Sequence, residues 1–87
     1  MSWRYRVIRS VDSDGTPVYQ IHEVYDGPRW TERAVAAAGE SLVSLADDLA
    51  RMGQAIAEPV LEEQDGALVE VPRARVKADR VGQIRGG

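Results

Sequence analysis

The chain has 87 residues, a formal net charge of −3, no cysteine and one histidine. This length allows one domain with a modest core, because a chain of this size buries only somewhat more than about 60% of its unfolded surface. The lack of cysteine excludes disulfides and thiolate metal sites, and a zinc site would need carboxylates or a second chain beside the single histidine. We therefore expect neither a metal nor a cofactor.

The first part of the chain predicts a β-hairpin. Residues 3–11 alternate with period two, as in a half-buried strand, and residues 12–15 have strong turn chemistry. Residues 18–25 then predict a second strand. The side chains that we expect on the core side of the sheet are Trp3, Tyr5, Val7, Ile21 and Trp30.

Residues 29–38 are open to two interpretations. Trp30, Thr31 and Val35 favour a third strand, whereas the three alanines at 36–38 favour a short helical turn. Gly39 ends the segment in either case. We predict the strand, and with it an antiparallel meander.

One amphipathic helix is predicted from Ser41 to about residue 57. Ser41 suits the N-cap position, and Pro59 cannot continue the helix. The apolar stripe, which we expect to pack on the sheet, consists of Leu42, Leu45, Leu49, Met52 and Ile56. The polar face, which we expect in water, consists of Ser44, Asp47, Asp48, Arg51 and Gln54. Asp47 and Arg51 have the spacing of an i,i+4 ion pair.

The last third of the chain predicts less regular structure. Residues 60–71 predict an optional short hairpin with its turn at residues 65–66. From Pro72 onward the chain has few large apolar residues and no clear period, so we expect a flexible tail. This divides the chain into an acidic domain of residues 1–71, whose thirteen acidic residues against six arginines give −7, and a basic tail of residues 72–87 with +4.

Together these elements predict an α+β two-layer domain. An antiparallel three-stranded meander packs on one long helix, with the short C-terminal hairpin as an addition. Two layers leave one face of the sheet bare. The residues of this bare face and of the basic tail that we assign to interaction are Arg4, Arg6, Gln20, His22, Arg73, Arg75, Lys77 and Arg80.

Several short segments taken as a set carry a resemblance to a known family. They are Ile21-His22-Glu23-Val24-Tyr25, Trp30-Thr31-Glu32, Gly39-Glu40-Ser41-Leu42, Leu49 with Met52, and Pro59-Val60-Leu61. Over about residues 4–63 this set resembles a family of small uncharacterised bacterial proteins. The resemblance implies strands before one helix and brings no activity, cofactor or catalytic residue. The chain departs from the family pattern at residues 33–36, which puts the conformation of residues 33–38 in doubt.

The end of the chain carries a shorter likeness. Ile84-Arg85-Gly86-Gly87 is similar to the C-terminus of ubiquitin-like modifiers, whose glycine tail enters narrow enzyme sites. This likeness implies adenylation of Gly87 by a partner enzyme. The insertion between the second strand and the helix departs from that family's fold, and the sequence leaves open whether Gly87 is the native terminus.

No pairing of residues has the spacing of a catalytic or metal site. His22 and Glu23 are neighbours in a strand, so their side chains point to opposite faces and cannot readily touch. The acidic pairs at 47–48 and 62–63 match no calcium-binding loop. Glycine-rich phosphate loops, nucleophile elbows and the His-Glu-x-x-His motif do not occur in the sequence. We expect a protein that is not an enzyme.

The sequence predicts a non-enzymatic protein-interaction module that binds itself or another protein through its exposed sheet face or an edge strand. One alternative is a nucleic-acid-binding accessory protein that uses the arginines of the first strand and the basic tail, although the acidic domain disfavours phosphate binding. The other alternative is a ubiquitin-like modifier or sulfur carrier.

Two features of the sequence bear on location. The start lacks the apolar stretch of a secretory signal, and no segment approaches the about 20 apolar residues of a membrane span. We therefore expect a cytoplasmic bacterial protein.

Overall fold

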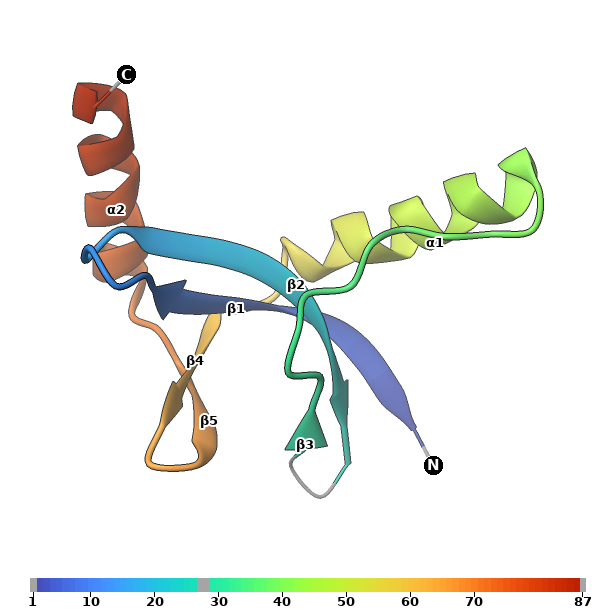
Figure 1. Cartoon of the computed structure of the whole chain (residues 1–87), viewed down its shortest axis with the longest axis horizontal. Coiled ribbons are helices and arrows are strands. Elements are labelled where there is room, and N and C mark those ends of the chain that lie inside the picture. The colour runs from blue at the N-terminus through green and yellow to red at the C-terminus, as the bar shows by residue number, and fades with distance from the viewer. Residues whose placement is uncertain (1, 27–28, 87) are drawn as a thin grey trace.

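The computed structural model describes residues 2–26 and 29–86, with residues 80–86 described through their backbone alone. The chain is an α+β protein in which a five-stranded mixed sheet carries two helices (Figure 1). The elements are β1 (Trp3–Val11), β2 (Pro17–Tyr25), β3 (Arg29–Trp30), α1 (Leu42–Ala55), β4 (Leu61–Gln64), β5 (Ala67–Glu70) and α2 (Arg73–Gly86). The strand order is β3-β2-β1-β4-β5. The predicted meander forms its first three strands, but the sequence did not predict that β4 joins β1 in parallel, with Ile8 opposite Leu61.

The long β1–β2 hairpin sets the two faces of the sheet. Its turn closes with Asp12 N donating to the Thr16 carbonyl at 2.9 Å, and Gly15 takes a φ of 87° that favours glycine. Residues that are opposite in register share a face. The helix-bearing face therefore carries Val7 opposite Ile21, while the other face carries His22 opposite Arg6.

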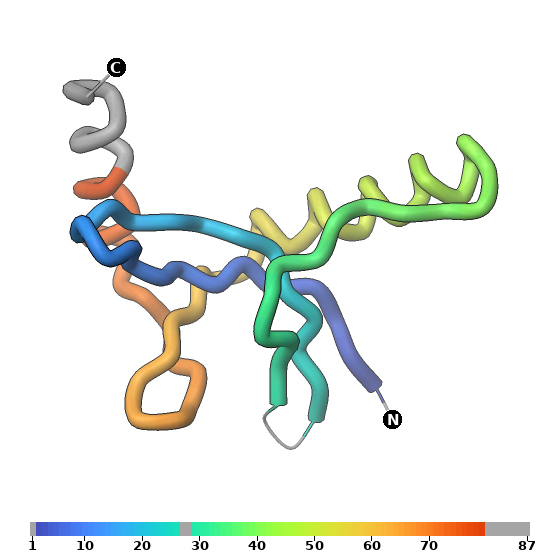
Figure 2. Tube along the Cα trace, in the orientation of Figure 1, coloured from blue at the N-terminus to red at the C-terminus, as the bar shows by residue number. Residues whose placement is uncertain are grey.

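Residues 31–41 have no regular secondary structure and form neither the long third strand nor the helical turn. β3 itself has two residues, after which Thr31 N donates to the Glu23 carbonyl at 3.0 Å and Val35 N to the Ile21 carbonyl at 2.9 Å. In a helix over residues 31–38 the Val35 N–H would donate to the Thr31 carbonyl, so its bond to β2 is incompatible with that helix. The segment then runs alongside α1 (Figure 2). Gly39 permits this approach, because a Cβ there would lie 2.4 Å from the Leu45 backbone nitrogen.

The predicted C-terminal hairpin is present as β4 and β5. Its two turn residues, Asp65 and Gly66, have φ values of 54° and 82°. Two successive left-handed residues are the requirement of a type I′ turn, and Asp-Gly satisfies it.

Helix α1 confirms the predicted cap but not the predicted buried face. The side chain of Ser41 accepts from Ser44 N at 3.1 Å. Asp48 is buried together with Met52, while Leu49 is 59% exposed. The remaining large apolar side chains of this helix that lie in water are Leu42 (81% exposed), Val43 (72%) and Ile56 (70%).

The rotation of α1 follows from hydrogen bonding. Asp48 accepts from the Tyr5 hydroxyl at 2.5 Å and from Ala38 N at 3.0 Å, so its carboxylate is satisfied against the sheet. The Asp47–Arg51 ion pair that we predicted is replaced by Asp48–Arg51 at 3.7 Å. Figure 1 shows the first turns of α1 extending beyond the sheet.

The two tryptophans do not form the predicted core. Trp30 pairs with Val24, and Val24 pairs with Arg4, so Trp30 belongs to the face opposite the helices. Trp3 is 43% exposed and forms a T-shaped ring pair with Tyr5 at a centroid distance of 5.0 Å. Trp3 shares the helix-bearing face with Tyr5 but is not buried, and Trp30 lies on the opposite face, so neither tryptophan belongs to the buried core.

The basic segment after Pro72 forms α2, where the sequence predicted no regular structure. Its anchor is Asp79, which accepts from Arg9 Nε at 2.6 Å and from the hydroxyl of Tyr19. We predicted a flexible tail because this segment has few apolar residues. In the structure, polar contacts hold the segment on the sheet instead of apolar packing. The division at residues 71 and 72 into a domain and a flexible tail stays a prediction.

The buried apolar core is small. It consists of Val7, Ile8, Met52, Ala55, Leu61 and Val71. The chain exposes 6630 Å², against about 5100 Å² for a compact monomer of this mass. Its radius of gyration is 14.1 Å, against about 12 Å for a compact domain of this length.

Candidate functional site

The two helices diverge from the same face of the sheet (Figure 1). An apolar hollow is lined by residues of this face, of the C-terminal end of α1 and of α2. Its volume is about 590 Å³. The apolar side chains that line it are Val7, Ile21, Ala34, Val35, Ile56, Val60 and Val76, with Tyr19 and Gln20 at the β2 side. An open apolar surface of this kind is typical of a binding groove.

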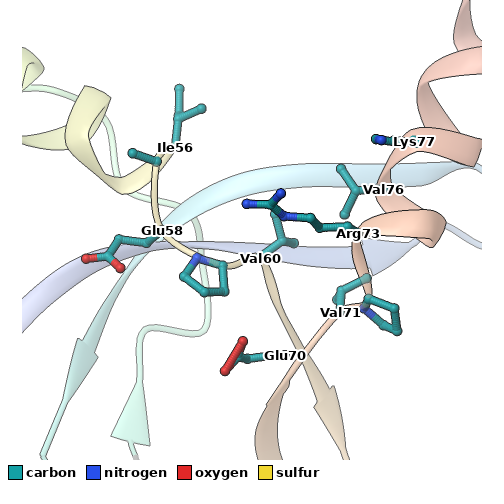
Figure 3. A pocket seen from close by; sticks show the side chains of 11 residues that line it. Ile56, Glu58, Val60, Glu70, Val71, Arg73, Val76 and Lys77 are labelled. Atoms are coloured by element: carbon teal, nitrogen blue, oxygen red, sulfur yellow. The ribbon is translucent and has the colours of Figure 1, made fainter.

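A second hollow of about 690 Å³ adjoins the first and shares Ile56, Val60 and Val76 with it. Figure 3 shows the base of this hollow at Val60, with Arg73 and Lys77 projecting from α2. The two hollows together are called the interhelical groove below. Its bottom is apolar and its outer rim is charged.

The exposed side of α1 continues this groove as an uncharged surface. It consists of Leu42, Val43, Ala46, Leu49, Ala50, Gly53, Ile56 and Ala57, all of which are exposed. We call these eight residues the apolar face of α1. Ile56 also lines the interhelical groove, so the face and the groove form one continuous surface.

The apolar face is held in place by the contact between Tyr5 and Asp48. The hydrogen bond to the Asp48 carboxylate raises the pKa of Tyr5 to about 12, with burial and charge adding to the effect. The same bond, followed by that from Ala38 N, lowers the pKa of Asp48 below its ordinary value. The neutral phenol and the ionised carboxylate therefore stabilise each other across the neutral pH range.

On the other side of the groove, charged residues hold α2. Hydrogen bonds from Arg9 and then Tyr19 lower the pKa of Asp79, and burial together with the bond to Asp79 raises the pKa of Tyr19. Glu62 lies 3.7 Å from both Arg9 and Arg75. The side chains of Arg9 and Asp79 are 11% and 13% exposed, so this cluster is mostly shielded from water.

The face of the sheet opposite the helices holds Arg4, Arg6, Gln20 and His22, as their register requires. His22 is 7% exposed, and its Nδ1 lies 2.8 Å from the Thr31 carbonyl oxygen. That oxygen can only accept, so Nδ1 donates. His22 also lines an open hollow of about 510 Å³ with Trp30. His22 therefore lies on the face to which we assigned it, but it is buried there.

The other sequence-predicted residues lie on α2. Arg73, Arg75 and Lys77 are exposed, and Arg75 pairs with Glu62 at 3.7 Å. The side chain of Arg80 and the glycine at residue 87 lie outside the described residues, as do residues 27–28. The arginines at positions 4 and 6 and the basic residues of α2 lie on opposite faces of the sheet, so the structure does not bring them together.

Sequence reasoning missed the apolar face of α1 as a surface. The spacing of Leu42, Leu49 and Ile56 by seven residues was visible, but it was assigned to packing within the chain. Gly53 was the second signal, because a glycine inside a helix costs about 1 kcal/mol relative to alanine. A Cβ at Gly53 would meet nothing within 4 Å, so no contact within the chain requires the glycine.

In the part of the chain that the structure describes, no group of three or more histidine, cysteine, aspartate or glutamate side chains is placed to hold a metal ion. Among the described helices, neither is long and apolar enough to cross a bilayer.

Comparison with known proteins finds no match for the chain among protein-family models, curated proteins or solved structures. The resemblance to small bacterial proteins stays a prediction.

Proposed function

We propose that the chain is a non-enzymatic protein-interaction module whose contact surface is the apolar face of α1 together with the interhelical groove. The observation that supports this is the exposure of Leu42, Leu49 and Ile56 at 59–81% on one side of one helix. Burying a leucine or isoleucine side chain contributes about 1.5–3 kcal/mol. Covering these three residues would therefore supply several kcal/mol of binding energy.

The orientation of α1 favours the binding of a partner to its apolar face. The helix is anchored at its inner side through Asp48, so its outer side is presented in a defined orientation. A preorganised helix face loses less conformational entropy on binding than a flexible segment. Such a face binds a partner helix or groove through residues spaced by three, four and seven positions.

Binding of nucleic acid by the first strand and the basic segment receives less support. Arg4 and the basic residues of α2 lie on opposite sides of the sheet, and Arg9 is engaged by Asp79. A phosphate backbone would have to reach both sides of an acidic body.

The test compares the full chain with Leu49→Glu and Gln54→Glu, which add the same charge on and off the apolar face. Light scattering after size exclusion and a pull-down with immobilised chain measure self-association and foreign partners. We expect protein binding, of either kind, to be lost in Leu49→Glu and kept in Gln54→Glu. A parent chain that is strictly monomeric and retains no protein would overturn the proposal.

A further inference from the structure

Resting on the proposed function, we infer that the partner is a second copy of this chain. The α1 helices of two copies pack antiparallel along their apolar faces, about a two-fold axis that passes beside Leu49. Each helix thereby brings Leu42 to Ile56 of the other copy.

The spacing of the large apolar residues along α1 makes the apolar face complementary to itself. Leu49 is the midpoint of the apolar face, and Leu42 and Ile56 lie seven residues to either side, which is about 10.5 Å along a helix. A two-fold axis at the midpoint of an antiparallel pair superposes each outer position on the opposite one. The face is therefore complementary to itself, as an isologous interface must be.

The charge distribution also favours pairing of two copies through this face. In an isologous interface, charges near the two-fold axis meet their own copies, and like charges in contact are repulsive. The apolar face of α1 has no charged residue, whereas residues 1–71 together carry −7. Antiparallel packing also places the two acidic bodies at opposite ends of the helix pair, where they are farthest apart.

The small residues of the apolar face allow two α1 helices to pack closely. Ala46, Ala50 and Gly53 lie between the large side chains and have no side chain longer than a methyl group. Small residues let two helix backbones approach closely, and larger apolar residues beside them then interdigitate. This close approach accounts for Gly53, whose α-hydrogen faces open space in the single chain.

The exposed area of the chain is large compared with the area that a dimer interface needs. The chain exposes 6630 Å², which is about 1500 Å² more than a compact monomer of its mass. A stable dimer of standard size buries about 800 Å² on each partner. The excess area is thus larger than the area that one partner buries in such a dimer.

The interhelical groove is completed by the same arrangement. Ile56 lies at the edge of the groove, and Leu42 of the second copy meets Ile56 across the axis. The first turn of the second α1, with Leu42 and Val43, then covers the open side of the groove. Each copy would supply a part of the core that the other lacks.

The first experiment measures mass and affinity by light scattering and sedimentation equilibrium on the full chain at tens of micromolar. We expect twice the 9.6 kDa of one chain. Leu49→Glu should raise the dissociation constant by at least about 30-fold, the effect of removing an interface hot spot. Gln54→Glu, which adds the same charge outside the face, should change it by less than about threefold.

The second experiment uses the absence of cysteine to read the orientation. Leu42→Cys chains mixed with Ile56→Cys chains should form a mixed disulfide under mild oxidation, and Leu49→Cys chains should link to themselves. Gln54→Cys chains should not link. Self-linking of Ile56→Cys chains in place of the mixed product would show parallel packing and overturn the inference.

The outcomes separate the inference from the proposed function. A monomeric chain that binds a different protein, with loss in Leu49→Glu, overturns self-pairing and leaves the interaction module in place. A monomeric chain that binds no protein overturns both. A dimer that survives Leu49→Glu uses another surface and also overturns the inference.

Discussion

The two helices of this protein have equal length and pack on the same face of one sheet, but they are held in different ways. Each is anchored by an aspartate that accepts from a tyrosine of the sheet, Asp48 from Tyr5 and Asp79 from Tyr19. Around the first anchor the helix carries an apolar surface that is left largely in water. Around the second it carries mainly charged residues, held by Arg9.

This difference distinguishes a helix that is held by contacts within the chain from a helix whose surface is free to bind a partner. Helix α2 relies on charge-assisted hydrogen bonds, which are strong when shielded from water. Helix α1 obtains its orientation from one such contact and keeps most of its large apolar side chains exposed. Apolar area that is not used in folding is available for association. Perturbing the two anchors and the apolar face separately should therefore have different effects.

Acid should produce the largest effect, because it removes both anchors at once. The pKa values of Asp48 and Asp79 are lower in the folded chain than their ordinary value of 3.8. The unfolded state therefore binds protons more readily, so the stabilisation is complete above about pH 5 and is lost as pH falls through the lowered folded values. Urea unfolding followed by circular dichroism across this range measures the loss.

The alkaline side supplies the control for this pH dependence. The pKa of Tyr5 is raised to about 12 from 10.0. The Tyr5 contribution should be complete below pH 10 and lost as pH rises through about 12. A free energy of unfolding that is flat between pH 5 and pH 2 would contradict the role of the two carboxylates.

Asp79→Ala should produce the next largest effect and act mainly on α2. Arg9 would lose its closest carboxylate partner while remaining mostly buried, which costs about 2–3 kcal/mol. Hydrogen exchange should show loss of protection at residues 73–79, with α1 unchanged. Asp47→Ala, which removes an exposed carboxylate from α1, is the matched control and should change stability by less than about 0.5 kcal/mol. Equal protection of α2 in both variants would show that Asp79 does not anchor it.

Tyr5→Phe should have a smaller effect, confined to α1. It removes one hydrogen bond to a charged group, worth about 1.5 kcal/mol, and keeps the ring against the sheet. Because Asp48 still accepts from Ala38 N, the helix should remain and its orientation should loosen. Amide exchange near Ala38 and Asp48 should accelerate, whereas Tyr25→Phe, at a more exposed pair with Glu23, should leave it unchanged. The reverse order of these two effects would contradict the anchor.

Sequence reasoning reached the local elements better than the contacts between them. The turn at Asp65-Gly66 and the cap at Ser41 were predictable because each depends on a few neighbouring residues. The rotation of α1 was not, because it depends on Tyr5 meeting Asp48, forty-three residues away. Hydrophobic periodicity alone would have buried Leu49 and exposed Asp48, and a satisfied carboxylate reverses that order.

For α2 and the opposite face of the sheet, too, contacts between distant residues could not be predicted from the sequence. Helix α2 has few apolar residues, so no periodicity indicated it, and its docking through Arg9 could not be inferred from spacing. The placement of Arg6 with His22 was predictable from alternation in the hairpin. The burial of His22 was not, because it depends on the irregular path of residues 31–41.

Gly53→Ala should have the smallest effect and distinguishes most sharply between the folding and the binding roles of α1. Within one chain a methyl group at this position meets nothing within 4 Å. Alanine should therefore stabilise the helix, by up to about 1 kcal/mol, in a Leu49→Glu background that prevents pairing. In the parent chain the same methyl group would separate two closely packed backbones and weaken self-association. Parallel urea titrations and sedimentation measurements test both halves, and a variant that gains stability while keeping its full affinity would place Gly53 outside the contact.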